Sequence, residues 1–185
     1  MIDDILRDTR RHMDKSVEAL RHDLSSIRTG RASPALLDRI TVEYYGTPTP
    51  LNQLALISVP EARILTIKPY DRSTMNLIEK AILKSDLGLN PSNDGQIIRL
   101  VLPQLTEQRR KELVKQAQKR VEEAKVALRN IRRDAMKDLQ DAEKEDLITE
   151  DDLEEGKEQV QKLTDKVMEQ LEGIGKAKEA EIMEV

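Results

Sequence analysis

The chain has 185 residues, of which 36% are charged and only 2% are aromatic. It contains no Phe, Trp or Cys, which excludes disulfides, thiolate metal sites and cysteine nucleophiles. A core without large rings has to be filled by aliphatic side chains, and narrow helical bundles can be built in that way. No apolar run approaches the roughly 18–20 residues that span a bilayer, and the first residues do not resemble a targeting signal. We therefore expect a soluble, cytoplasmic protein without a membrane segment.

Proline is absent from residues 1–33 and 104–185, and all seven prolines lie between Pro34 and Pro103. Because proline in a helix interior costs roughly 3 kcal/mol, long helices are expected in the two proline-free arms. In the first arm, apolar side chains recur mostly at spacings of three and four, which predicts a helix over residues 2–29 that ends at Gly30. These side chains are Leu6, Met13, Val17, Leu20, Leu24 and Ile27.

Residues 31–104 follow a different pattern, which is typical of a small α+β domain. The pattern predicts strands at residues 40–45, 55–59, 63–69 and 96–102 and a short helix at residues 74–85. The intervening turns are expected at residues 46–50, 60–61 and 93–95, where Gly, Pro and Asn-Asp-Gly occur. The predicted organisation is a first domain built from residues 1–30 and 105–185, interrupted by a second domain over residues 31–104.

Two further helices are predicted in the second arm. Thr106 is a suitable N-cap for one, and Thr149 with Asp152 forms an approximate capping box for the other. Each would be roughly 50 Å long, and the short connection near residues 146–148 makes them antiparallel. Three apolar stripes on one chain favour an intramolecular three-helix bundle, and hence a monomer, over an intermolecular coiled coil. The last two stripes are Val114, Ala117, Val121, Ala124, Leu128, Ile131, Ala135, Leu139 and Ala142, and Leu153, Gly156, Val160, Leu163, Val167, Leu171, Ile174 and Ile182.

The chain crosses between the two predicted domains twice, at residues 29–33 and 103–106. Two short, adjacent links, one with Gly30 and one with Pro103, are typical of a hinge, although a rigid elbow has the same sequence pattern. The predicted hinge residues are Thr29, Gly30, Arg31, Pro103, Gln104, Leu105 and Thr106.

The overall net charge of -4 conceals an uneven distribution, because residues 107–137 carry +6 and residues 138–185 carry -11. Within the basic stretch, Arg129, Arg132 and Arg133 have the i, i+3, i+4 spacing that places side chains on one side of a helix. The planar guanidinium suits phosphate, and without aromatic side chains for stacking the expected mode is recognition of folded RNA through its backbone and shape. The alternative is a surface neutralised by salt bridges to Glu122, Glu123, Asp134 or the acidic third helix.

Other kinds of chemistry have weaker signals, and the sequence nominates no catalytic residue, metal site or cofactor. His12 and His22 would lie roughly 15 Å apart on one helix, too far for a shared metal site. Gly173 and Gly175 lack the rest of a phosphate-binding loop and are interpreted as close helix packing. An enzyme using Lys68, Tyr70 and Asp71 is an alternative, but Asp71 is more simply a cap for the following helix. A scaffold that binds proteins through its acidic face is a second alternative.

Six short segments resemble the signature sequences of bacterial ribosome recycling factors. They are RTGRASP at 28–34, YYGTP at 44–48, DLGLNP at 86–91, NDG at 93–95, RNIRRD at 129–134 and QKLTD at 161–165. They span nearly the whole chain in the family's order, so together they are far more specific than any one alone.

This resemblance implies an L-shaped, tRNA-like protein in which a three-helix bundle carries a small inserted β/α/β sandwich domain. It implies binding to the post-termination ribosome and, with elongation factor G and GTP hydrolysed on that partner, dissociation into subunits with release of mRNA and tRNA. The factor itself would catalyse no reaction. The residues expected at ribosomal RNA of the large subunit are, in order of preference, Arg132, Arg129, Arg110, Arg28, Arg31 and Arg133.

Overall fold

The computed structural model describes residues 1–184, and these divide into two compact units. The first, called here the helical unit, consists of residues 1–29 and the chain from residue 106 onward. The second, the inserted unit, consists of Gly30–Leu105. The fold belongs to the α+β class, with long helices that pack together and two small antiparallel sheets.

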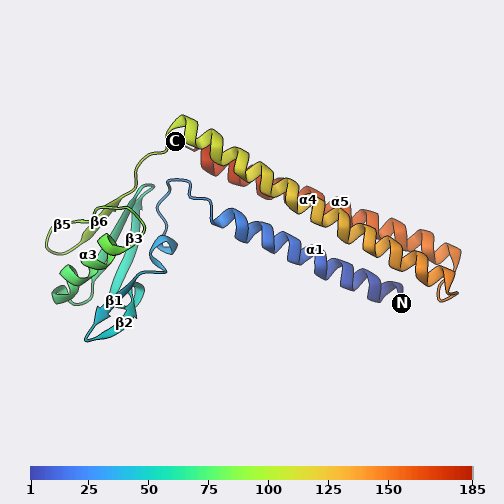
Figure 1. Ribbon diagram of the computed structural model, residues 1–185, viewed down its shortest axis with the longest axis horizontal. Helices are drawn as coiled ribbons and strands as arrows, with labels where there is room; N and C mark the ends of the chain where they lie inside the picture. Colours follow the sequence, from blue (N-terminus) through green and yellow to red (C-terminus); the bar gives the residue numbers. More distant parts are fainter. Residues whose placement is uncertain (185) are drawn as a thin grey trace. The chain divides into compact units, whose positions relative to one another are not determined.

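Three long helices form the helical unit, and each packs against the other two, as the three-stripe pattern predicted (Figure 1). They are α1 (Ile2–Ser25), α4 (Glu107–Lys144) and α5 (Glu150–Met183). The predicted caps are confirmed: the Thr106 hydroxyl accepts a hydrogen bond from the Arg109 amide, and Thr149 and Asp152 form a reciprocal capping box. Between α4 and α5, Asp146 adopts a positive φ of 56°, and the Leu147 amide bonds back to the Ala142 carbonyl. This αL turn reverses the chain within a few residues, so that α5 runs back along α4.

The end of α1 differs from the prediction. The helix ends at Ser25 rather than near Gly30, because Ser25 and Ser26 donate their hydroxyls to the carbonyls of His22 and Asp23, both at 2.6 Å. These bonds satisfy carbonyls that a continuing helix would have used, and side chains of this type compete with the backbone ladder. Ile27, beyond the helix end, is nevertheless buried.

The core of the helical unit is aliphatic, and it is narrow where small residues lie between the helices. Leu113 is buried in place of the predicted Val114, which is only half-buried. A methyl group added at Gly175 would lie 2.7 Å from Cγ2 of Val121, whereas nothing lies within 4 Å of the equivalent position at Gly173. Of the two glycines interpreted as packing residues, only Gly175 therefore has that role.

The inserted unit contains a two-stranded and a four-stranded antiparallel sheet. The strands are β1 (Thr41–Tyr44), β2 (Thr47–Pro50), β3 (Ala55–Glu61), β4 (Ile64–Pro69), β5 (Ser92–Asn93) and β6 (Ile98–Val101), with the order β1-β2 in one sheet and β3-β4-β6-β5 in the other. Short helical segments accompany them: η1 (Pro34–Leu37), α2 (Leu51–Leu54), η2 (Arg72–Thr74) and α3 (Met75–Lys84). In the register, Leu65 lies opposite Leu100 and Ile67 opposite Ile98, and all four are buried. They share one core with Ile78 and Ile82 of α3.

Two details of the inserted unit correct the sequence prediction. Residues 47–50, expected as a turn, form strand β2, because Tyr45 and Gly46 with φ values of 50° and 77° already reverse the chain as a two-residue loop. Pro60 and Glu61, also expected as a turn, extend strand β3, which pairs irregularly with β4 there.

Candidate nucleic-acid interface

Arg129, Arg132 and Arg133, named here the arginine triplet, lie near the middle of α4 next to its buried stripe. Leu128 and Ala135 on that stripe are buried, whereas Arg129 and Arg133 are exposed and Arg132 is half-buried. Within residues 1–184, no carboxylate forms an ion pair with any of the three arginines. Three positive charges are therefore presented on one part of the helix without a neutralising partner.

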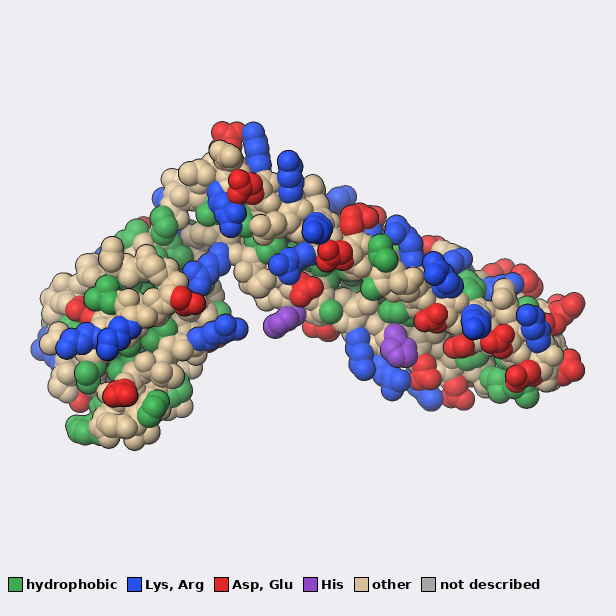
Figure 2. All heavy atoms as spheres, viewed as in Figure 1, with side chains coloured by type: hydrophobic (Ala, Val, Ile, Leu, Met, Phe, Trp, Pro, Cys, Tyr) green, Lys and Arg blue, Asp and Glu red, His purple; other side chains and the backbone are tan. Residues whose placement is uncertain are grey.

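The cations of the first half of α4 are arranged differently. Arg109 pairs with Glu112 at 3.0 Å, Lys111 with Glu107 at 3.6 Å, and Arg120 with Asp23 of α1 at 4.0 Å. Lys125 contacts both Glu122, at 3.4 Å, and Glu172 of α5, at 3.2 Å. The predicted alternative of a salt-bridged surface thus describes these four cations, but it does not describe the arginine triplet. Figure 2 shows the resulting mixture of basic and acidic side chains along the helical unit.

Among the described residues, Arg132 is the one member of the triplet that is held in place by a neighbouring helix. Its Nε donates a hydrogen bond to Oε1 of Gln161 on α5 at 2.8 Å. The Gln161 amide nitrogen in turn donates to Oδ1 of Asp165, one helical turn further on, at 2.8 Å. The sequence signal for this contact was the segment 161–165, which was used only as a family motif and not as a partner of the arginines.

The remaining predicted RNA-binding arginines are not part of this cluster. Arg110 precedes Arg132 by 22 positions on α4, roughly 33 Å along the axis. Its Nε is buried and has no hydrogen-bond partner among the described residues. Arg28 is exposed, beyond the end of α1 that packs against the first half of α4. Arg31 belongs to the inserted unit, and its side chain is also exposed.

The two chain crossings have well-defined anchors on both sides. On the side of the helical unit, the Thr29 hydroxyl donates to Glu181 of α5 at 3.3 Å, and Thr106 caps α4. In the inserted unit, the Ala32 amide bonds to the Ala62 carbonyl at 2.7 Å and the Leu102 amide to the Arg63 carbonyl at 2.8 Å. Gly30, at φ +78°, lies against Leu105, since an added Cβ would be 3.3 Å from its Cγ. The two crossings therefore contact each other within the inserted unit.

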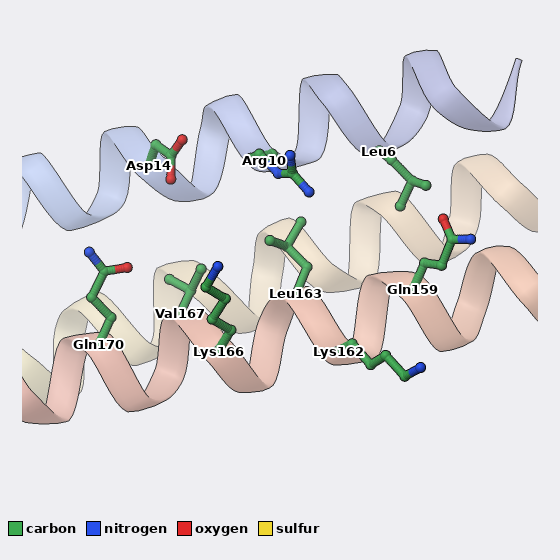
Figure 3. Close-up of a pocket in the computed structure, with 9 residues that line it drawn as sticks. All are labelled: Leu6, Arg10, Asp14, Gln159, Lys162, Leu163, Lys166, Val167 and Gln170. Atoms are coloured by element: carbon green, nitrogen blue, oxygen red, sulfur yellow. The ribbon is translucent and has the colours of Figure 1, made fainter.

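A shallow groove of about 460 Å³ lies between α1 and α5 of the helical unit (Figure 3). Leu6, Leu163 and Val167 line it with apolar surface. Arg10 of α1 and Lys166 of α5 point toward the space between the helices, whereas Lys162 points away from α1. None of the six predicted RNA-binding arginines lines this groove, so it is separate from the candidate interface.

Comparison with known proteins decides the family. The family model "Ribosome recycling factor" matches residues 20–183. The ribosome-recycling factors of Syntrophomonas wolfei and Heliobacterium modesticaldum are 60% and 57% identical to this chain over 185 residues, which covers each chain completely. The chain belongs to the ribosome recycling factor family. The resemblance seen in the six sequence segments is thereby confirmed.

Solved structures of ribosome recycling factors have the same fold. A solution structure of a ribosome recycling factor is 43% identical, covers 100% of this chain and 98% of that chain, and gives a TM-score of 0.74. A second structure consists of models for the T. thermophilus ribosome recycling factor and the E. coli elongation factor G bound to the E. coli post-termination complex. It is also 43% identical, covers 100% of both chains, and gives a TM-score of 0.64.

The other sites considered from the sequence have structural explanations in this ribosome recycling factor family member. The Asp71 carboxylate accepts hydrogen bonds from the hydroxyl and the amide of Ser73, at 2.8 Å and 2.9 Å, which lower its pKa and cap η2. Lys68 and Tyr70 are exposed. His12 and His22 are exposed on α1, and residues 1–184 contain no group of His, Cys, Asp and Glu that could hold a metal ion. No described helix is long and apolar enough to span a membrane.

Proposed function

We propose that this chain binds the post-termination ribosome and, together with elongation factor G, dissociates it into subunits with release of mRNA and tRNA. Membership of the ribosome recycling factor family supports this proposal, as does the related structure on a post-termination complex with elongation factor G. GTP is hydrolysed on the elongation factor, and this chain catalyses no reaction. Its place of action is the cytoplasm, where the ribosomes are.

The arginine triplet is the proposed anchor on large-subunit ribosomal RNA, with Arg132 as the principal contact. The observation that carries this proposal is the absence of ion pairs at the triplet among the described residues, in contrast to Arg109, Lys111, Arg120 and Lys125 on the same helix. An unpaired guanidinium offers phosphate two parallel charge-assisted hydrogen bonds without first breaking a salt bridge. Arg28, Arg31 and Arg110 are proposed as additional contacts outside the triplet.

The crossings between the two units are the proposed hinge, at Thr29–Arg31 and Pro103–Thr106. Thr29 and Thr106 are bonded to the helical unit, and residues 32 and 102 to the inserted unit. Between these anchors, Gly30, Pro103, Gln104 and Leu105 make no backbone hydrogen bond to any described residue. Bending at these residues would leave the packed cores of both units intact. A displacement of the inserted unit by elongation factor G would then be transmitted through the stiff helices to RNA.

Co-sedimentation of the full chain with vacant ribosomes over a range of salt concentrations tests the binding proposal. We expect the logarithm of the affinity to fall linearly with the logarithm of the salt concentration, because cations that contact phosphate release counterions. Failure to co-sediment at low salt would contradict the proposal and favour a scaffold that binds proteins through its acidic face.

Substitutions of Gly30 test the hinge. Valine at φ +78° is strongly disfavoured and would crowd Leu105, whereas asparagine tolerates this backbone conformation. We expect Gly30→Val to slow GTP-dependent subunit splitting by the chain with elongation factor G more than it weakens ribosome binding, with Gly30→Asn closer to the unsubstituted chain. Equal losses of splitting and binding in Gly30→Val would contradict a role in motion.

A further inference from the structure

Gln161 of α5 contacts Arg132 of the arginine triplet, and it is not one of the six predicted RNA-binding residues. It lies half-buried on α5, and its side-chain oxygen accepts the hydrogen bond from Arg132 Nε at 2.8 Å. Among the described residues, neither Arg129 nor Arg133 has such a contact. Arg132 is therefore the only member of the triplet whose side chain is fixed across the interface between α4 and α5.

We propose that Gln161 is a positioning residue, which fixes the Arg132 guanidinium so that its two terminal nitrogens face an RNA phosphate. This inference rests on the proposed RNA contact by Arg132. A guanidinium has five N–H donors, and Gln161 occupies only the one on Nε. The four N–H groups of the terminal nitrogens remain, and two of them form the planar fork that matches two phosphate oxygens.

The chemistry of an amide explains why glutamine suits this position. A neutral carbonyl oxygen accepts from Nε and orients the side chain, but it does not cancel the positive charge. A carboxylate at the same place would form an ion pair with the guanidinium and compete with the phosphate. The first half of α4 has that arrangement, since Arg109 is engaged by Glu112 at 3.0 Å.

Asp165 fixes the orientation of the Gln161 amide. Its Oδ1 accepts from the Gln161 nitrogen at 2.8 Å, and the two residues are four positions apart on α5, so their side chains lie on the same face. If the amide turned over, its oxygen would face a carboxylate and its NH2 group would face a guanidinium, and both contacts would be repulsive. The Gln161 oxygen is thereby directed to Arg132.

Positioning of this kind affects the affinity for RNA by lowering the entropic cost of binding. A free arginine side chain loses many rotamers when phosphate immobilises it, whereas one already held at Nε loses fewer. Removal of Gln161 should therefore weaken binding although the charge of Arg132 stays in place. The number of counterions released should not change, because it depends on the number of cations at phosphate.

The experiment measures ribosome affinity against salt concentration for the full chain carrying Arg132→Ala, Gln161→Ala, both substitutions, or Gln161→Glu. Gln159→Ala is the matched control, since Gln159 lies two positions away on α5 and, among the described residues, its side chain bonds only to Glu155, at 3.4 Å. We expect Arg132→Ala to lower the salt slope, which is the steepness of log affinity plotted against log salt concentration, by about one. Gln161→Ala should weaken binding about 3- to 10-fold with an unchanged slope. Gln161→Glu should also lower the slope, because its carboxylate neutralises Arg132.

The double variant separates positioning from a general structural role. With Arg132 removed, Gln161→Ala should have no further effect on affinity, and Gln161→Ala should still unfold in one cooperative thermal transition, as Gln159→Ala does. If Gln161→Ala leaves affinity unchanged while Arg132→Ala lowers it, or if its effect persists in the Arg132→Ala background, the positioning role is wrong. If Arg132→Ala itself has no effect on affinity or slope, the proposed RNA contact by Arg132 fails instead.

Discussion

The two halves of α4 carry similar cations in different settings. In the first half, Arg109, Lys111, Arg120 and Lys125 all form ion pairs, two of them with carboxylates of other helices. In the second half, the arginine triplet forms none with the described residues, and Arg132 is bonded to a neutral amide. The difference lies in the carboxylates within reach: Arg109 and Lys111 pair with acidic residues of α4 itself, and Arg120 and Lys125 reach Asp23 of α1 and Glu172 of α5.

This difference separates a structural use of charge from a use in binding. A cation paired on the protein has to give up a carboxylate before it can contact phosphate, which for exposed pairs such as these costs up to about 1 kcal/mol. An exposed, unpaired arginine has no such cost, but it contributes little to the stability of the fold. The four paired cations of the first half of α4 should therefore affect mainly stability, and the arginine triplet mainly ribosome affinity.

The largest expected effect is the loss of ribosome affinity when the whole triplet is replaced by alanine. Each charge-assisted contact removed should weaken binding roughly 10-fold or more, and the salt slope should fall by about three for the three substitutions together. Filter binding or co-sedimentation with vacant ribosomes between low and high salt measures both quantities.

Arg109, Lys111 and Arg120 provide the control for this triple replacement. Their replacement by alanine removes the same amount of positive charge from the same helix, but these cations are already paired with carboxylates. It should change the salt slope much less. Equal slopes for the two triple variants would show that net charge, and not the absence of ion pairs, controls binding.

The next largest effect concerns packing of the first half of α4 against α5. Gly175→Ala places a methyl group 2.7 Å from Cγ2 of Val121, a β-branched side chain that is stiff in a helix. Overpacking of this kind costs about 1–3 kcal/mol of unfolding free energy and exceeds the gain in helix propensity. Urea denaturation should show the loss, and Val121→Ala should restore much of it.

Gly173 supplies the matched control for Gly175, because nothing lies within 4 Å of its added Cβ. Gly173→Ala should stabilise the protein by about 0.5–1 kcal/mol, which is the ordinary difference in helix propensity. If both alanine variants are more stable than the unsubstituted chain, the interface between α4 and α5 is looser at residue 175 than the structure indicates.

Much of this fold can be predicted from the positions of proline and of apolar residues. The second and third long helices, with their caps at Thr106 and Thr149, follow from patterns that involve only neighbouring residues. The early end of α1 could not be predicted in this way, since Ser25 and Ser26 had to compete with the backbone ladder for its last carbonyls. Strand β2 was missed because a Thr-Pro repeat is typical of a turn unless another strand lies beside it.

The candidate site was predictable only in part. The spacing of the triplet placed it on one side of a helix, but spacing cannot show which cations have partners on another helix. Glu172, which pairs with Lys125, lies 47 positions away in sequence, and Gln161, which holds Arg132, lies 29 positions away. Both contacts form only because α5 folds back along α4. Gly175 was interpreted correctly and Gly173 wrongly for the same reason.

A smaller effect is expected at Lys125, whose side chain is only 16% exposed between Glu122 and Glu172. Lys125→Ala should lower the unfolding free energy by about 0.5–1 kcal/mol, because ion pairs near the surface contribute little. The loss should shrink in high salt, which screens the pairs. Lys115, an exposed cation of the same helix without an ion pair to a described residue, is the control. A loss that does not respond to salt would indicate that the aliphatic part of the Lys125 side chain, and not its charge, provides the stabilisation.

The smallest expected effect concerns Asp94 in the inserted unit, whose carboxylate is bonded to backbone amides and not to a cation. Its Oδ1 accepts from the amides of Ile97 and Gln96 at 2.9 Å and 3.0 Å, and these bonds lower its pKa, with Arg99 nearby as a weaker cause. A lowered pKa means that the folded state binds the proton less readily than the unfolded state. Stability from this group is therefore complete above the ordinary value of 3.8 and is lost as the pH falls through the lower, folded value.

Asp94→Asn keeps an oxygen acceptor but does not titrate. The difference in urea midpoint between the two proteins should be constant near neutral pH and should change only below about pH 4, with Asp86→Asn as the control. A difference in urea midpoint that stays constant throughout the acid range would contradict the lowered pKa of Asp94.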